Sequence, residues 1–194
     1  MRFIALAFFL LLALPAQAAI EPAEAERICS DPSIGDKWIP GDLFSVQGDV
    51  KRFLENTEFK GTEVVICFSE DTMATAWGML WETVGADNIF VVGVSKEFGE
   101  AMREHLYAVM AHEVAHLVIV HKDGACDKYR RLNDEVERIF CEHDADWVGS
   151  LWAGKPAILA ALKASISFGE GREYSPRFFT NLEKRIELLE QASE

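Results

Sequence analysis

Clusters of basic residues are missing from this sequence, and its formal net charge at pH 7 is −13. An acidic chain without grouped lysines and arginines offers little to a nucleic-acid backbone or an anionic lipid surface, so neither is expected as a partner. The sequence also lacks internal repeats, low-complexity tracts and segments with the composition of a linker. Its 194 residues therefore predict one compact domain.

Long apolar runs are also few, and the only one of note lies at the N-terminus. Arg2 supplies a positive start, residues 3–14 form an apolar run too short to span a bilayer, and residues 16–18 (Ala-Gln-Ala) form a small-x-small cleavage site. We expect a signal peptide at 1–18 and a mature chain at 19–194 that has no transmembrane segment and is periplasmic or secreted. The alternative is a retained anchor, against which the short run and the Ala-x-Ala pattern both count.

Cysteine is scarce, with only four residues, at positions 29, 67, 126 and 141. An even number in an oxidising compartment predicts two disulfides. Of the three possible pairings, we favour Cys29–Cys67 with Cys126–Cys141, because each bond then joins neighbouring segments. The spacings do not resemble those of a zinc finger, so the cysteines are not expected to be metal ligands.

The hydrophobic pattern predicts a few strands followed mainly by helices, which is an α+β layout in a single domain. β-branched apolar runs predict strands at 62–68 and 89–94, where Gly93 marks a bulge or a close approach. Residues 21–26 are expected to be loose, and residues 32–48 are expected to form loops and turns. Apolar residues at helical spacing predict the helices, at 50–56, 71–83, 98–121, 131–153, 156–168 and 178–191.

The longest predicted helix contains the motif His112-Glu113-Val114-Ala115-His116. His112 and His116 are four residues apart, so their imidazoles lie on one face of a helix, where two neutral imidazoles can hold one zinc ion. Glu113 lies beside them and is placed to accept a proton from a zinc-bound water and to pass it to a leaving amine. The alternative is a chance match, in which the histidines only cap a polar edge. Burying His and Glu side chains on an otherwise apolar helix costs free energy unless they have a function, and this counts against a chance match.

A catalytic zinc site needs a third protein ligand and one open position. Glu142, Asp146 and Gly149 fall on one stripe of the second long predicted helix. We predict that Glu142 is the third ligand and that Asp146 hydrogen-bonds a ligand imidazole and fixes its tautomer. Gly149 would allow a neighbouring helix to approach closely. The rival ligand is His143, which points about 100° away from Glu142 around the helix, so the two should not both reach the metal.

These motifs carry a family resemblance. Residues 107–116, followed by His121, resemble the active-site helix of gluzincin zinc metallopeptidases of the HtpX and CAAX prenyl endopeptidase kind. In that family a later helix carries Glu-x-x-Ala-Asp followed shortly by Gly, as residues 142–149 do here. The resemblance implies a zincin-like domain, in which a small sheet packs on a helical bundle. It also implies zinc bound by His112, His116 and Glu142, with Glu113 as the general base and residues 89–94 pairing with an extended substrate.

The resemblance covers about residues 62–189, with departures. The chain lacks the transmembrane helices and the helical-repeat extension of many members, and Ser175 stands where a His usually precedes the C-terminal Pro. A residue that stabilises the transition state is therefore not assignable, although Tyr174 and Arg185 are candidates. The expected function is a zinc-dependent endopeptidase, with one zinc ion per chain, that hydrolyses exported polypeptides, including unfolded or misassembled ones. The alternatives are a catalytically silent zinc-binding chaperone or interaction module, and hydrolysis of a non-protein amide.

Overall fold

The computed structural model describes residues 20–32, 34, 38–70, 76–81, 89–123 and 135–192, so the expected signal peptide lies outside it. The described residues form an α+β architecture, as the sequence predicts, with seven α-helices and one four-stranded sheet. None of the helices within these ranges combines the length and apolar character needed to cross a membrane. In chain order the elements are α1 (Pro22–Cys29), β1 (Ile39–Pro40), α2 (Gln47–Leu54), β2 (Glu63–Ser69), β3 (Ala76–Trp81), β4 (Ile89–Ser95), α3 (Lys96–Ala101), the 3₁₀ helix η1 (Arg103–His105), α4 (Leu106–Asp123), α6 (Glu135–Ala153), α7 (Lys155–Gly169) and α8 (Pro176–Gln191).

The sheet has the strand order β1-β2-β4-β3. The two central strands are parallel, with Val65 opposite Val91, whereas β1 and β3 pair with them antiparallel. All seven residues of β4 are buried, which agrees with its continuous apolar sequence, because a strand covered on both faces has no polar side. Strand β3 forms the edge of the sheet beside β4.

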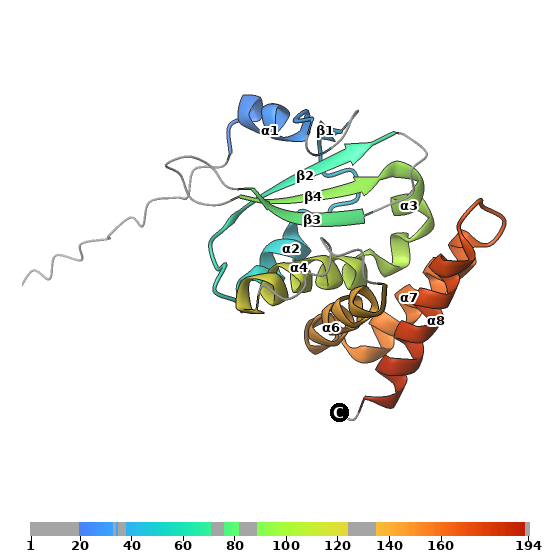
Figure 1. Cartoon of the computed structure of the whole chain (residues 1–194). Helices are drawn as coiled ribbons and strands as arrows, with labels where there is room; N and C mark the ends of the chain where they lie inside the picture. The colour runs from blue at the N-terminus through green and yellow to red at the C-terminus, as the bar shows by residue number, and fades with distance from the viewer. Residues whose placement is uncertain are drawn as a thin grey trace, which may run out of the picture.

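The two faces of the sheet are covered by different helices (Figure 1). Helix α1 lies over one face, where Ile28 packs with Val65 and Val91. The predicted disulfide between Cys29 and Cys67 is confirmed, and it ties α1 to β2. Cys141 is also disulfide-bonded, while its expected partner, Cys126, lies outside the described residues. Helices α2 and α4 cover the opposite face and form the larger core with β2 and β4.

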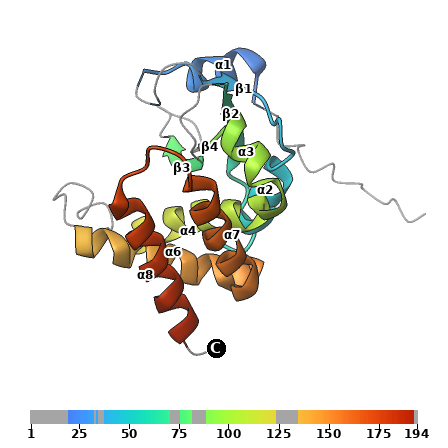
Figure 2. The same cartoon turned by 90° about the vertical axis from the view of Figure 1, so that its right-hand side faces the viewer.

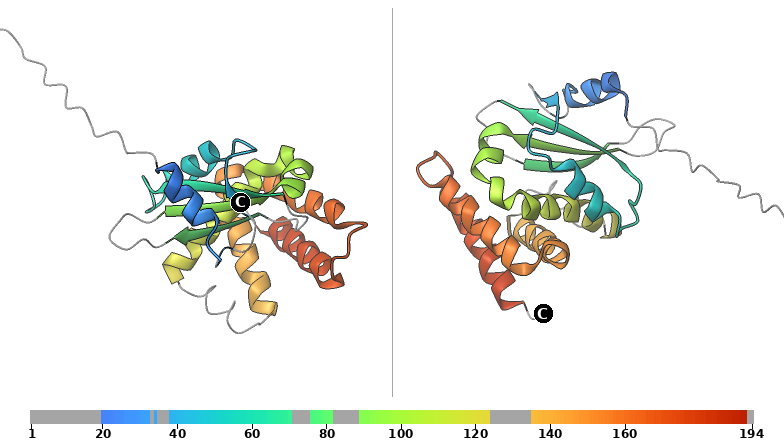
Figure 3. Two further views of the ribbon diagram at one scale, coloured as in Figure 1. Left: turned by 90° about the horizontal axis from the view of Figure 1, so that it is seen from above. Right: turned by 180° about the vertical axis from the view of Figure 1, so that it is seen from behind.

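Helices α6 and α7 pack on the side of α4 that faces away from the sheet, and α8 packs on α6 and α7 (Figure 2). Helices α7 and α8 lie side by side and are joined by a short turn, as the views from above and behind show (Figure 3). Helix α6 lies against the backbone of α4 at Gly149. A Cβ at this position would lie 3.2 Å from the backbone nitrogen of His112, so the small residue permits the contact as expected.

The predicted helix at 71–83 is wrong where the structure describes it, because residues 76–81 form strand β3. Trp77 and Met79 both pack against the core cluster beneath α1, and the Trp77 ring meets Trp38 at 5.2 Å between centroids. Gly78 faces the other side of the sheet, towards Phe90. This alternation has a period of two, which competes with the helical spacing of the same apolar residues. Residues 71–75 and 82–83 lie outside the described residues.

The prediction that residues 21–26 are loose is also wrong, because helix α1 begins at Pro22. An ion pair of 2.6 Å joins Arg27 to Glu24, and the buried end of the helix is fixed by its disulfide. The predicted loop at 32–48 contains β1, and its last two residues begin α2. The predicted helix at 98–121 is divided into α3, η1 and α4, whereas the last two predicted helices are confirmed to within two residues at each end.

Candidate metal site and adjoining pocket

Helices α4 and α6 bring the side chains of His112, His116 and Glu142 together. The Nε2 atoms of the two histidines are 3.0 Å apart. The two carboxylate oxygens of Glu142 lie 3.4 Å from Nε2 of His112 and 3.7 Å from Nε2 of His116. Ligand atoms at 2.0–2.1 Å from a tetrahedral zinc ion are about 3.3–3.4 Å from one another. The three side chains therefore have the donor chemistry and the spacing of three corners of such a coordination shell.

Asp146 lies one turn after Glu142 on α6 and accepts a hydrogen bond from Nδ1 of His112 at 2.8 Å. This contact assigns the proton of neutral His112 to Nδ1, so that the lone pair on Nε2 points into the cluster. Asp146 is 1% exposed. Burial alone would raise its pKa, but Arg185 and His112 outweigh burial and lower the pKa of Asp146 to about 2.

Arg185 reaches the cluster from α8. Its guanidinium donates two hydrogen bonds to the carboxylate of Asp146, at 2.8 and 2.7 Å, and its Nη1 lies 3.1 Å from an oxygen of Glu142. The sequence suggests Arg185 as a stabiliser of the transition state, but the structure places it as a fork that holds two carboxylates. The sequence contains an indication that Arg185 is buried and paired. Arg185 lies on the same face of its helix as Leu182 and Leu189, and a charged side chain on a buried face needs a partner of opposite charge.

The charges in this cluster favour a cation between the histidines and Glu142. Burial opposes charge on His112, but Asp146 and Glu142 outweigh it and raise the pKa of His112 to about 10. Burial would likewise raise the pKa of Glu142, yet its contacts with the two histidines and Arg185 hold the pKa well below its usual range. Both carboxylates are thus ionised at neutral pH, and their negative charge suits a divalent metal ion.

Glu113 points from α4 into the space beneath the edge strand β3, where a Cβ on Gly78 would lie 3.4 Å from its own Cβ. Burial raises the pKa of Glu113, and the two nearby histidines oppose the shift. A carboxylate whose pKa moves towards neutrality is suited to accept a proton and then release it. The chemistry of this position therefore fits a general base.

No protein-family model, curated protein or solved structure matches this chain. The likeness to gluzincin peptidases therefore rests on the sequence motifs at 112–116 and 142–146. The structure adds that these motifs, which are separate in the sequence, meet at one place.

The rival ligand His143 lies outside this cluster. Its Nδ1 is 3.7 Å from a carboxylate oxygen of the exposed Asp144, and its buried Nε2 has no hydrogen-bond partner among the described residues. It is Glu142, rather than His143, that the fold brings to His112 and His116.

The family resemblance implies that residues 89–94 pair with a substrate, and the topology corrects this expectation. These residues belong to β4, which is hydrogen-bonded to β2 on one side and to β3 on the other. Neither of its edges is available for a further strand. The strand that borders the site is β3, whose residue Gly78 packs over Glu113.

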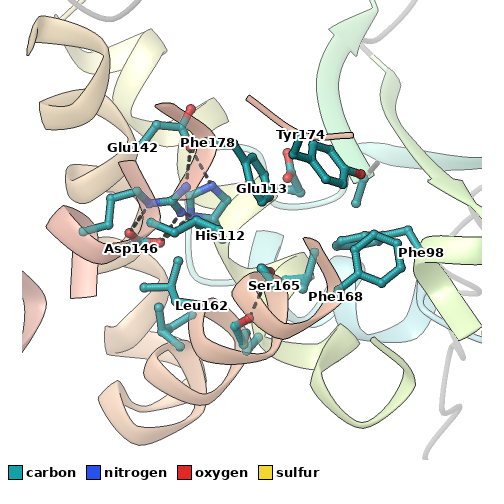
Figure 4. Close-up of a pocket in the computed structure, with 17 residues that line it drawn as sticks. Phe98, His112, Glu113, Glu142, Asp146, Leu162, Ser165, Phe168, Tyr174 and Phe178 are labelled. Carbon is teal, nitrogen blue, oxygen red and sulfur yellow. Dashed lines mark hydrogen bonds and ion pairs between the residues drawn. The ribbon is translucent and has the colours of Figure 1, made fainter. Parts of the chain in front are cut away.

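A cavity of about 220 Å³ adjoins the cluster and runs between α3, α4, α7 and α8. Its polar end is formed by His112, Glu113 and Glu142 together with Asp146 and Arg185. The rest of its wall is mainly apolar, and in Figure 4 the rings of Phe98, Phe168 and Tyr174 lie on the opposite side from His112, Glu142 and Asp146, with Glu113 between them. The cavity is therefore a pocket with a reactive end and an apolar end.

Proposed function

We propose that this protein is a zinc-dependent endopeptidase of the gluzincin type, with a zincin-like fold, that cleaves exported polypeptides. The observation that carries the proposal is the convergence of two imidazole nitrogens and one carboxylate, at tetrahedral spacing, beside the half-buried Glu113. Two histidines and one glutamate are a ligand set of catalytic zinc that leaves one coordination position open. One zinc ion per chain is expected.

The residues of the site have distinct tasks in this proposal. When bound, zinc supplies a Lewis acid that polarises the scissile carbonyl and lowers the pKa of water at the open position. Glu113 accepts the proton of the attacking water and delivers it to the nitrogen of the leaving amine, as the C–N bond breaks. Asp146 keeps the proton of His112 on Nδ1, and Arg185 fixes the carboxylates of Asp146 and Glu142.

Two further features support a polypeptide substrate outside the cytoplasm. Among the described residues, strand β3 is an edge strand of the sheet and lies beside Glu113, and extended peptides bind proteins by pairing with edge strands. An unfolded or misassembled protein offers such a segment, whereas a folded protein keeps its strands paired. The Cys29–Cys67 disulfide fits the oxidising compartment that the N-terminal sequence predicts.

The test uses the purified protein, a reduced and carboxymethylated protein substrate, and elemental analysis for zinc. We expect a chelator to abolish cleavage and added zinc to restore it. Glu113→Gln should retain zinc while cleavage falls by about 10²- to 10⁴-fold, because the proton acceptor is lost. Glu142→Ala should lose zinc, whereas the matched control His143→Ala should keep both zinc and activity.

Two outcomes separate the alternatives. Cleavage that survives both chelation and Glu113→Gln contradicts a zinc peptidase. Stoichiometric zinc without cleavage of any extended peptide favours the catalytically silent zinc-binding module instead.

A further inference from the structure

Two pairs of aromatic rings line the pocket. Phe98 of α3 meets Phe168 of α7 edge to face, with 5.7 Å between ring centroids. Tyr174 stacks on Phe178 of α8 at 4.4 Å. All four residues line the pocket that contains Glu113. The four rings are referred to below as the aromatic end.

A clamp holds this aromatic end in place. Arg172, in the turn between α7 and α8, forms an ion pair of 2.6 Å with Glu97 of α3. Its guanidinium carbon lies 3.8 Å from the centre of the Phe168 ring, and its Nη1 donates a hydrogen bond to the carbonyl of Phe168. The ion pair is partly exposed and alone is worth little, but the stacking and the hydrogen bond add to it. The clamp therefore joins the turn to α3, on the side of the pocket away from the metal cluster.

The pocket has the size and polarity for one large apolar side chain. Its volume of about 220 Å³ exceeds the roughly 150 Å³ of an engineered cavity that binds benzene. Ile158, Ala161 and Leu162 complete the apolar wall between the rings and the cluster. A charged side chain placed there would lose its hydration without gaining a partner from this wall.

We propose that the aromatic end, held by the Arg172–Glu97 clamp, receives a phenylalanine or leucine side chain of the substrate next to the scissile bond. This inference rests on the proposed peptidase function and specifies its substrate. Phenylalanine and leucine are mostly buried in folded proteins, so this preference selects chains that have lost their fold. The pocket and the edge strand β3 thus favour the same class of substrate.

The first experiment compares fluorogenic peptides that differ only in having Phe, Leu, Ala or Asp at one of the two positions flanking the cleaved bond. At the position that enters the pocket, Phe and Leu should exceed Ala in kcat/KM by about 10- to 100-fold, because an apolar side chain is removed from water. Ala161→Leu fills the pocket and should remove most of this preference. Ala160→Leu, on the same helix but outside the pocket, is the matched control and should keep it.

A second variant tests the clamp without filling the pocket. Arg172→Ala should reduce the preference for Phe over Ala while the zinc content stays unchanged, because the contacts of Arg172 described above are with Glu97 and Phe168 and not with the proposed zinc ligands. The variant therefore keeps the inference testable if Ala161→Leu fails to fold.

A binding measurement separates the inference from the proposed function. Zinc-loaded Glu113→Gln protein is titrated with the hydroxamic acids of 3-phenylpropanoate and of acetate, and we expect the phenyl compound to bind at least about 10-fold more tightly. Ala161→Leu in the same background should remove this advantage. Equal cleavage of Phe and Ala peptides together with equal hydroxamate affinities would overturn the inference and leave the peptidase intact. Absence of cleavage with zinc bound would contradict the peptidase, while the hydroxamates still report on the pocket.

Discussion

The ion pair between Asp146 and Arg185 gives the sharpest prediction about stability. Both side chains are buried, at 1% and 9% exposure, and they are joined by two hydrogen bonds of 2.7 and 2.8 Å. Removing one partner of a buried pair costs about 3–5 kcal/mol where the other charge is left unpaired. Here the remaining charge keeps one contact, Arg185 with Glu142 at 3.1 Å or Asp146 with His112 at 2.8 Å, so the lower end of this range applies. Asp146→Asn keeps the shape of the side chain and Arg185→Met keeps much of its volume, so each should lower the free energy of unfolding by about 3 kcal/mol.

The double variant should be less destabilised than the sum of the two single variants. Once both charges are gone, neither is left buried alone, so we expect a coupling free energy of about 2–3 kcal/mol. The assay is urea unfolding at pH 7 with a chelator present, because bound zinc would stabilise the native state by mass action. The exposed pair Lys163–Glu190, at 3.1 Å, is the control, and its coupling should stay below about 1 kcal/mol. Additive effects of Asp146→Asn and Arg185→Met would refute the reasoning.

Three further predictions concern zinc binding, the Cys29–Cys67 disulfide and two glycines. Below its pKa of about 10, His112 binds a proton that zinc must displace, so zinc affinity, measured by chelator competition, should rise about tenfold per pH unit from pH 7 to 9. A pH-independent affinity would contradict this charge state. The Cys29–Cys67 bond closes a loop of 38 residues, so replacing both cysteines with alanine should lower the free energy of unfolding by about 4 kcal/mol, measured with urea; an unchanged midpoint would contradict it. Gly149→Ala should destabilise the protein by about 1–3 kcal/mol because its Cβ meets α4. Gly48 is an exposed residue of α2 with open space around it, so Gly48→Ala should stabilise the protein by up to about 1 kcal/mol, and thermal unfolding of both variants distinguishes these signs.

The sequence predicts the elements whose pattern has a single interpretation. The apolar run at 89–94 forms β4, and the last two helices begin and end close to their predicted bounds. Residues 76–81 are the counterexample, because Trp77, Leu80 and Trp81 fit a helical spacing although the chain forms a strand there. Pairing with β4 and the packing of Trp77 on Trp38 decide the outcome, and both are long-range effects that no local pattern contains.

The same distinction, between contacts within one helix and contacts between helices distant in the sequence, applies to the candidate site. The spacing of His112 and His116 within one helix fixes their common face, so the sequence alone brings them together. The stripe of Glu142 and Asp146 on a second helix indicates that these two act as a pair, but it does not say which helix lies opposite. The place of Arg185 depends on how α8 packs against α6, and its charge on an apolar stripe is only an indirect sign.

Arg185 lies 73 residues after His112 and 39 after Asp146 along the chain. Helix α8 therefore contributes a contact to the cluster from a distant part of the sequence, and a chain that is still being synthesised has both histidines and Glu142 before it has Arg185. Until α8 docks, the carboxylates of Asp146 and Glu142 lack the counter-charge of Arg185, although α6 can already pack against α4. Docking of α8 thus completes the charge balance of the cluster, so the order in which these helices fold together matters for the proposed metal site.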